Sequence, residues 1–274
     1  MALNVLVISK GHPFAHDAFI AMFEALEGVT MTLVEHPAAH AVLQPDAVAR
    51  YDVVFFYDMS GIPGVGLTHD DADAEGNPPD GYRTAIEHLV QSGKGLMLVN
   101  HATVGWPNWP LWRQISGSSF MLRTGQLNGE TVPGSGYRGA HGPLPNATIK
   151  VLPQGSHPVL EGLDDGFEIT DELYLKTPGF EANVVPLLRG DYDFVVSNFS
   201  PPPLAPPDEQ AAWDHPPGSN LLVWANACGR SPIVVSELGD SPLAYENPGY
   251  RRLLGNALRW LVSEEARQWA AQSG

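Results

Sequence analysis

Short runs of β-branched and aromatic residues alternate along the chain with segments whose apolar residues recur at helical spacing. Apolar runs at 4–9, 29–36, 51–59 and 95–100 predict strands. The segment 81–93, which ends in a glycine, predicts the helix that precedes the fourth of these strands. Because continuous apolar strands are typical of burial on both faces, this alternation predicts βαβ units and a parallel sheet.

The second half of the chain continues the pattern less regularly. Segments 192–197, 220–227 and 231–238 predict further strands. Asn247 followed by Pro248 is a typical helix start, and it precedes a stripe of apolar residues at helical spacing. We therefore expect the chain to end in an amphipathic helix that packs on the sheet.

Glycine and proline are concentrated in two places. They crowd residues 125–146, and the proline-rich segment 200–219 is predicted to be an insertion without regular structure. No internal repeat or linker divides the chain. We expect one domain over residues 1–274, an α/β fold with a three-layer, doubly wound, mostly parallel sheet and long loop insertions.

Ligands of an open parallel sheet bind outside the carboxyl ends of its strands. Residues just after the predicted strands are therefore the first candidates for chemistry. Imidazoles and carboxylates occupy these places: His12, His16, Asp58, His101 and Asp240.

The composition narrows the choice of ligand. The chain has 15 Lys and Arg against 31 Asp and Glu, a net charge of −16, which disfavours nucleic acid and anionic membranes as partners. Cys228 is the only cysteine, so no disulfide forms within the chain. The N-terminal residues lack the pattern of a signal peptide, and no apolar run approaches the roughly 20 residues of a membrane span. We expect a soluble cytoplasmic protein that binds a small molecule.

Four segments carry a resemblance to a known family: GHPFAHDAF at 11–19, GKGLMLVNHA at 93–102, SHPVLEGLDDGFEITDELY at 156–174, and SELGDSPLAYENPGYRRLLGNALRWL at 236–261. With these segments the chain resembles the ThuA-like (trehalose utilisation) proteins almost end to end. The resemblance implies a class I glutamine amidotransferase-like, flavodoxin-like fold and an association with sugar catabolism. We accordingly expect a sugar or sugar derivative as ligand, and a homo-oligomer.

The resemblance gives His101 a particular position. In related glutamine amidotransferases, the turn after the central strand carries a cysteine nucleophile, and His101 stands in or beside that place. Cys228 lies in a predicted turn between late strands, and no G-x-S-x-G motif supplies a serine. Glutamine hydrolysis through a thioester is therefore not expected. An imidazole there can act as an acid or base, donate to an oxyanion, or bind a metal.

Two more candidates come from matches to family motifs. Glu172 follows a predicted strand, and in extended chain Tyr174 shares its face while Asp171 points the other way. Pattern alone also allows Glu172 to be a surface carboxylate, but the family match favours the pocket. His141, in a glycine-rich loop, resembles a family histidine.

His12 and His16 are four residues apart, a spacing that suits a metal pair on one helical face. Pro13 is, however, predicted to start the helix, which would leave His12 in the preceding loop. Metal ligation, a polar contact to substrate and helix capping all remain open for this pair.

Aromatic and acidic residues complete the predicted binding site. Trp106 lies nearest the turn after the central strand and could stack on a sugar ring, or it could pack the loop against the sheet. Asp58 and Asp240 are predicted to contact substrate. Many relatives have Gly-His where this chain has Gly-Asp240, so a metal bound there would gain an oxygen ligand in place of nitrogen.

Three hypotheses for function follow. In the first, His101 and Glu172, helped by His16 and His141, move protons on a sugar, keto-sugar or glycoside derivative in isomerisation, elimination or hydrolysis. In the second, the chain is a metal-dependent hydrolase with a divalent ion such as zinc, whose candidate ligands are His16, His101, His141 and Glu172. In the third, it is a carbohydrate-binding protein without catalysis.

Overall fold

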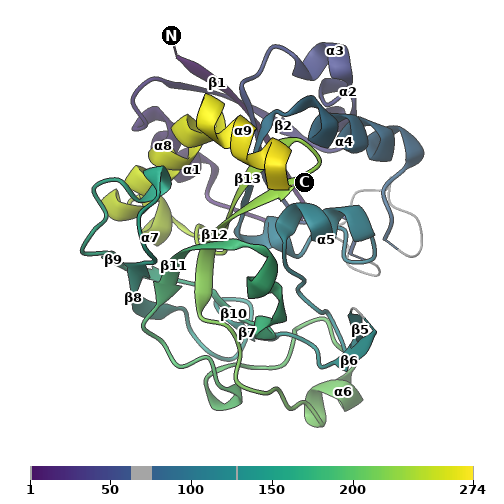
Figure 1. Cartoon of the computed structure of the whole chain (residues 1–274). Helices are drawn as coiled ribbons and strands as arrows, with labels where there is room; N and C mark the ends of the chain where they lie inside the picture. The colour runs from purple at the N-terminus through teal and green to yellow at the C-terminus, as the bar shows by residue number, and fades with distance from the viewer. Residues whose placement is uncertain (1, 63–75, 128, 274) are drawn as a thin grey trace.

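A nine-stranded sheet runs through the computed structural model of the chain, which describes residues 2–62, 76–127 and 129–273 (Figure 1). The strand order is β2-β1-β3-β4-β13-β12-β11-β8-β9. These strands are β1 (Leu3–Lys10), β2 (Val29–Glu35), β3 (Val53–Asp58), β4 (Gly95–Val99), β8 (Ala147–Pro153), β9 (Phe167–Asp171), β11 (Val185–Gly190), β12 (Leu221–Cys228) and β13 (Ser231–Ser236).

The sheet has a parallel part and an antiparallel part. Strands β2, β1, β3, β4 and β13 pair in parallel, and β12, β11, β8 and β9 continue the sheet by antiparallel pairing. The parallel part contains the predicted strands of the first half of the chain. Every residue of β3 and β4 is buried, as the continuous apolar runs predicted.

Helices cover both faces of the sheet. One core cluster joins the sheet to α1 (His16–Glu24) and α8 (Pro248–Leu261), and a second joins its other face to α4 (Asp80–Ser92) and α5 (Pro110–Ser116). The remaining helices are α2 (Ala38–Val42), α3 (Pro45–Val48), α6 (Pro207–Ala211), α7 (Pro242–Tyr245) and α9 (Glu264–Ser273). The three-layer, doubly wound α/β architecture is therefore confirmed.

Local signals in the sequence explain several boundaries. The side chain of Asn247 accepts a hydrogen bond from the amide of Tyr250 and caps α8, and Pro248 occupies the first turn, as predicted. Gly93 ends α4 with φ of +77°, a conformation that glycine adopts without strain.

Three local predictions were wrong. The segment 192–197 is no strand, because Phe194 packs its ring into the core from an irregular loop. The insertion 200–219 contains the short helix α6, in which Pro207 fits the first turn. Helix α1 starts at His16, because the chain from Gly11 first turns against Met59 before it can become helical.

Smaller strands lie beyond the main sheet. β7 (Gly136–Arg138) pairs with β10 (Leu173–Leu175), and β5 (Gly125–Leu127) pairs with β6 (Glu130–Val132). The first of these pairs lies beside the carboxyl ends of the parallel strands and contributes tyrosines to the site described below.

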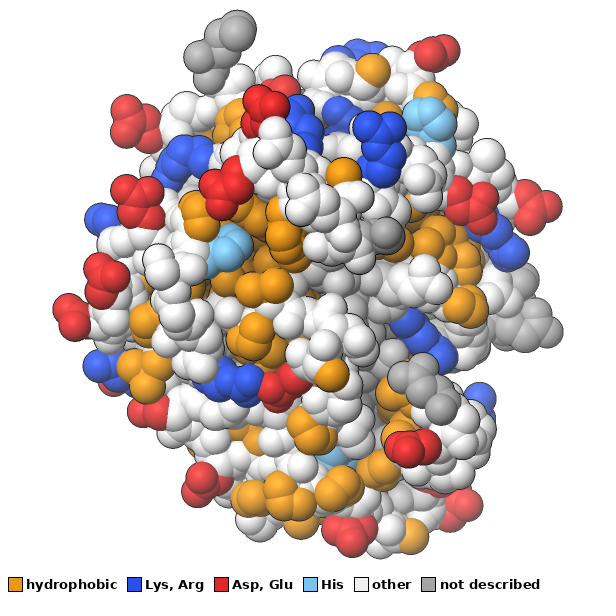
Figure 2. All heavy atoms as spheres, viewed as in Figure 1, with side chains coloured by type: hydrophobic (Ala, Val, Ile, Leu, Met, Phe, Trp, Pro, Cys, Tyr) orange, Lys and Arg blue, Asp and Glu red, His pale blue; other side chains and the backbone are white. Residues whose placement is uncertain are grey.

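Charged side chains are spread over the face shown in Figure 2. Acidic side chains stand mainly around its rim, with Lys and Arg side chains between them. Among the helices in the described ranges, none is long and apolar enough to cross a membrane.

Candidate active site

The chain makes a sharp turn where the central strand β4 ends. Asn100 follows it with φ of +50°, a left-handed conformation that asparagine tolerates better than most residues. The side-chain nitrogen Nδ2 of Asn100 donates a hydrogen bond to the backbone carbonyl oxygen of Glu237 at 2.9 Å. This turn places the buried side chains of Asn100 and His101 at the carboxyl edge of the sheet.

A group of histidines surrounds this turn. The His12 ring stacks on the His101 ring with centroids 4.2 Å apart, and His12 Nε2 lies 3.1 Å from His141 Nε2. Asp240 Oδ1 lies 3.9 Å from Nδ1 of both His12 and His101. Segments separated by more than 200 residues thus meet at one point.

Hydrogen bonding determines which nitrogen of His101 faces this group. Its Nε2 lies 3.0 Å from the carbonyl oxygen of Tyr57, which can only accept, so Nε2 carries a proton. Nδ1 is consequently the atom that faces Asp240 and Asn100.

Glu172 forms the acidic side of the site. The residue is buried, with 2 % of its surface exposed. Its carboxyl group contacts two hydroxyl groups: Tyr137 donates to Oε1, and the Tyr174 oxygen lies 3.2 Å from Oε2. Burial, together with the negative charge of Asp240, raises the pKa of Glu172 to about 8. Glu172 is therefore protonated at neutral pH.

The hydrogen-bond network around Tyr174 has a place for that proton. The Tyr174 hydroxyl lies 2.9 Å from Asn100 Oδ1 and 3.2 Å from Glu172 Oε2, and it has one proton for these two acceptors. The orientation of the Asn100 amide is fixed by its donation to a carbonyl. A protonated Glu172 satisfies both contacts, since it can donate to the Tyr174 oxygen while Tyr174 donates to Asn100.

The loop that carries Asp240 is held from both sides. Asp171 accepts hydrogen bonds from the backbone amides of Gly239 at 2.6 Å and Asp240 at 3.3 Å. The Tyr57 hydroxyl donates to the Gly239 carbonyl, and the Tyr245 hydroxyl donates to the Asp240 carbonyl, each at 2.8 Å. Burial raises the pKa of Asp171 to about 7.

The surroundings lower the pKa values of both His12 and Asp240. Burial lowers the pKa of His12 to about 3, and the neighbouring His101 contributes to this shift. The His12 imidazole is therefore neutral at physiological pH. Burial opposes ionisation of Asp240, but the neighbouring imidazoles outweigh it and hold the pKa of this carboxyl below its usual range. The ionised Asp240 thus faces the neutral imidazole of His12.

The structure brings six of the predicted residues together and leaves three outside. Those that meet are His12, His101, His141, Glu172, Tyr174 and Asp240. His16 is exposed at the start of α1, where its ring stacks on Phe14 at 4.1 Å. Asp58 is fully buried and contacts His36 and Ser60.

The prediction that Trp106 stacks on a substrate is corrected by its burial. The side chain is 0 % exposed and belongs to the core cluster beneath α4, with its ring 5.3 Å from that of Tyr82. Trp109 and Trp112 belong to the same cluster. A tryptophan close to the turn along the chain therefore packs the loop against the sheet.

The set of metal-binding candidates also changes. Of the predicted ligands His16, His101, His141 and Glu172, only His101 belongs to the group in the described residues whose ligand atoms lie within 4.8 Å of one another. The other members of that group are His12 and Asp240.

Sequence reasoning missed Asn100 and Tyr137 as site residues. Asparagine at the end of a buried strand is a signal for a left-handed turn, and it could have marked Asn100 as the turn position. Tyr137 has no comparable signal, because its strand is three residues long and lies in a glycine-rich segment.

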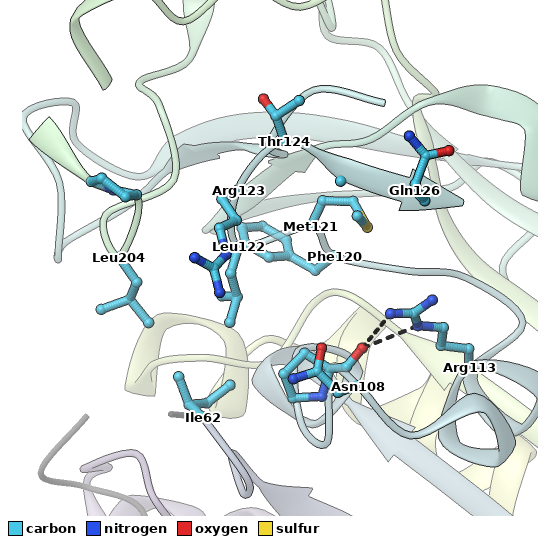
Figure 3. Close-up of a pocket in the computed structure, with 13 residues that line it drawn as sticks. Ile62, Asn108, Arg113, Phe120, Met121, Leu122, Arg123, Thr124, Gln126 and Leu204 are labelled. Atoms are coloured by element: carbon cyan, nitrogen blue, oxygen red, sulfur yellow. Dashed lines mark hydrogen bonds between the residues drawn. The ribbon is translucent and has the colours of Figure 1, made fainter. Parts of the chain in front are cut away.

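The structure has a pocket of about 360 Å³ between the segment 120–126 and the residues around Asn108 (Figure 3). Its wall includes Ile62 and Phe120, which pack in one apolar group with Tyr137 and Tyr174. The Phe120 and Tyr174 rings meet edge to face with centroids 5.3 Å apart. Arg123 reaches toward this space from the loop above it (Figure 3). The pocket offers an apolar surface and hydrogen-bond donors, and Phe120 connects it to Tyr174.

Comparison with known proteins identifies the family and the fold. The model of the trehalose utilisation family, ThuA, matches residues 4–261. ThuA-like proteins of known structure from Parabacteroides merdae and Bacteroides uniformis have TM-scores of 0.63 and 0.62 at 17% and 18% identity; each alignment covers 96% of this chain, and 91% and 92% of theirs. No curated protein matches the chain.

A third similar structure, of PurLQS from Thermotoga maritima, has a TM-score of 0.51 at 13% identity and covers 95% of this chain and all of its own. At these identities, the structural matches establish the fold alone. Together with the match over residues 4–261, they show that the chain belongs to the trehalose utilisation (ThuA) family and has the α/β fold of class I glutamine amidotransferase-like proteins.

Proposed function

We propose that the chain is a carbohydrate-processing enzyme in which Glu172 is the proton donor toward a sugar or keto-sugar derivative. The observation that carries this proposal is the Tyr174 hydroxyl group, which has two acceptors and one proton. A neutral Glu172 completes the network. A buried carboxylic acid with a pKa near the working pH is suited to general acid catalysis.

The same group can return as a base in the next step. After Glu172 gives its proton to a leaving or carbonyl oxygen, the Tyr137 hydroxyl stabilises the resulting carboxylate, since it already donates to Oε1. Tyr174 can then turn its proton from Asn100 to Oε2. Isomerisation, elimination and hydrolysis all need such a reversible proton transfer.

The family supports a sugar as the substrate, and the turn after β4 argues against glutamine. The turn after β4 begins with Asn100 and His101, and neither is a cysteine or serine nucleophile. Cys228 is buried at the end of β12, and burial raises the pKa of its thiol to about 11, so it is a poor nucleophile. The pocket lined by Phe120, which packs on Tyr174, is large enough for the part of a substrate that does not react.

The proposal is tested with trehalose and with oxidised trehalose that carries one ketone, in deuterated buffer. NMR detects both exchange of hydrogen next to the ketone and release of free sugar. The wild-type chain should catalyse one of these reactions, and Glu172→Gln should slow it by roughly 10²- to 10⁴-fold. Glu168→Gln, an exposed change in the strand β9 that precedes Glu172, is the matched control and should retain the rate.

Sugar binding measured in parallel separates catalysis from binding alone. If the wild-type chain binds these sugars but neither exchanges hydrogen nor releases product, it is a carbohydrate-binding protein. If Glu172→Gln keeps the wild-type rate, the proton donor is another residue, and the proposed role of Glu172 is wrong.

A further inference from the structure

Two polar atoms in the cluster are buried and have no hydrogen-bond partner. They are His12 Nδ1 and Asp240 Oδ1. Their separation of 3.9 Å is too long for a hydrogen bond. Buried polar groups are rarely left unpaired, so two that face each other indicate that something binds between them.

His101 adds a third atom aimed at the same space. Because Nε2 donates to the Tyr57 carbonyl, a neutral His101 presents a lone pair at Nδ1. That lone pair faces Asn100 Oδ1 at 3.2 Å and Asp240 Oδ1 at 3.9 Å, and both of these are acceptors. Lone pairs that converge without a donor repel one another unless a cation lies among them.

The anchoring of His101 is typical of a metal ligand. A histidine that binds a metal usually donates its other ring nitrogen to a carbonyl or carboxylate, which fixes the tautomer and the ring. His101 makes this contact to Tyr57, and the second nitrogen of His12 is engaged by His141. Stacking of His12 on His101 further restricts both rings.

The ligand types and spacing define the class of ion. Two imidazole nitrogens and one carboxylate oxygen form the donor set of catalytic zinc sites that keep an open position. Ligand atoms around a tetrahedral zinc ion lie about 3.3 Å apart, so the 3.9 Å separations would close by roughly half an ångström on binding. All three atoms already lie within 4.8 Å of one another.

We propose that His12 Nδ1, His101 Nδ1 and Asp240 Oδ1 bind one divalent transition-metal ion of the class to which Zn²⁺ and Co²⁺ belong. The site is part of the proposed catalytic cluster and in this respect rests on the proposed function. An ion there would polarise a substrate oxygen next to the proton donor Glu172. Binding of the ion is nevertheless measurable without any substrate.

The experiment titrates the EDTA-treated chain with Co²⁺ and then displaces it with Zn²⁺. The visible absorption of Co²⁺ reports nitrogen and oxygen ligands in a low-symmetry site, and calorimetry gives the stoichiometry and Kd. We expect one ion per chain. Loss of a residue that hydrogen-bonds to a metal ligand typically weakens metal binding 10- to 100-fold. Asp240→Asn and His101→Asn remove the ligands themselves, so each should weaken binding by about 100-fold or more.

Two further variants make the result specific. Asp240→His replaces the carboxylate with another ligand and should keep the site, which shows that Asp240→Asn acts by losing a ligand and not by unfolding. Glu172→Gln should slow turnover by roughly 10²- to 10⁴-fold and leave metal binding intact, so the two proposals can fail separately. Glu168→Gln is the control for binding of cations to the acidic surface.

Two results would overturn the metal site. Either the wild-type chain binds no Co²⁺ above the background of its surface carboxylates, or Asp240→Asn binds as tightly as the wild type.

Discussion

Replacement of Glu172 by glutamine should stabilise the protein at alkaline pH, although it removes the proposed proton donor. Glutamine has nearly the shape of a protonated glutamic acid and cannot ionise. Its carbonyl oxygen can accept from Tyr137, and its amide nitrogen can donate to the Tyr174 oxygen while Tyr174 donates to Asn100. The substitution therefore keeps the neutral network and eliminates a buried charge.

The size of the effect follows from the pKa of Glu172, which rises from 4.5 to about 8 on folding. Between these two values, the unfolded chain has released the proton and the folded chain still holds it. The unfolded state then binds fewer protons, so stability falls as pH rises through this range. One pKa unit corresponds to about 1.4 kcal/mol. The raised pKa of Glu172 therefore destabilises the folded state by roughly 1.4 kcal/mol near pH 5.5 and by roughly 4–5 kcal/mol above pH 8.

Urea denaturation followed by tryptophan fluorescence measures this difference in the presence of EDTA. The gap in unfolding free energy between Glu172→Gln and wild type should grow by about 3 kcal/mol between about pH 5.5 and pH 9. A packing difference that does not depend on pH cancels in this comparison, and Glu168→Gln should show no such trend. A gap that stays constant with pH would refute the assignment of a raised pKa to Glu172.

Three further predictions concern the surroundings of the site. Tyr137→Phe removes a hydrogen bond that favours ionised Glu172, so the upper pH limit of activity should move upward in a pH–rate profile; a downward shift would contradict this. Gly239→Ala should cost roughly 2–4 kcal/mol in urea denaturation, because at φ of +115° its Cβ would lie 2.1 Å from the Tyr250 hydroxyl oxygen; an unchanged midpoint would show that the loop adjusts. Asp171→Asn should destabilise the chain by roughly 1–3 kcal/mol, since an amide nitrogen cannot accept the backbone N–H bonds that Asp171 receives, and hydrogen exchange at Gly239 should rise; unchanged protection there would argue against this role.

The sequence predicts which distant residues lie close together where the sheet topology alone determines their position. His12, His101 and Asp240 each follow a strand of the parallel part of the sheet, and parallel strands end at a common edge. Their proximity in the structure follows from that topology alone. The alternation in the segment around Glu172 likewise places Tyr174 on its face and turns Asp171 away, as expected.

The side-chain arrangement within that edge could not be predicted in the same way. Whether Trp106 faces a ligand or the core depends on the direction of a loop, and its left-handed backbone at φ of +46° has no sequence signal. Asp58 ends a strand like the site residues, but its side chain points to the other face, where His36 binds it. The antiparallel strands β7 and β10 bring Tyr137 to Glu172 through a pairing that no local pattern encodes.

The protonation state of Glu172 at neutral pH can be observed directly. Infrared difference spectra of wild type against Glu172→Gln isolate its carboxylic acid C=O stretch from that of other buried acids such as Asp171. In the presence of EDTA, we expect a band that is present at pH 7 and titrates away near pH 8. A band that is absent at pH 7 and appears only near pH 4.5 would show an ordinary carboxylate and contradict the proposed acid.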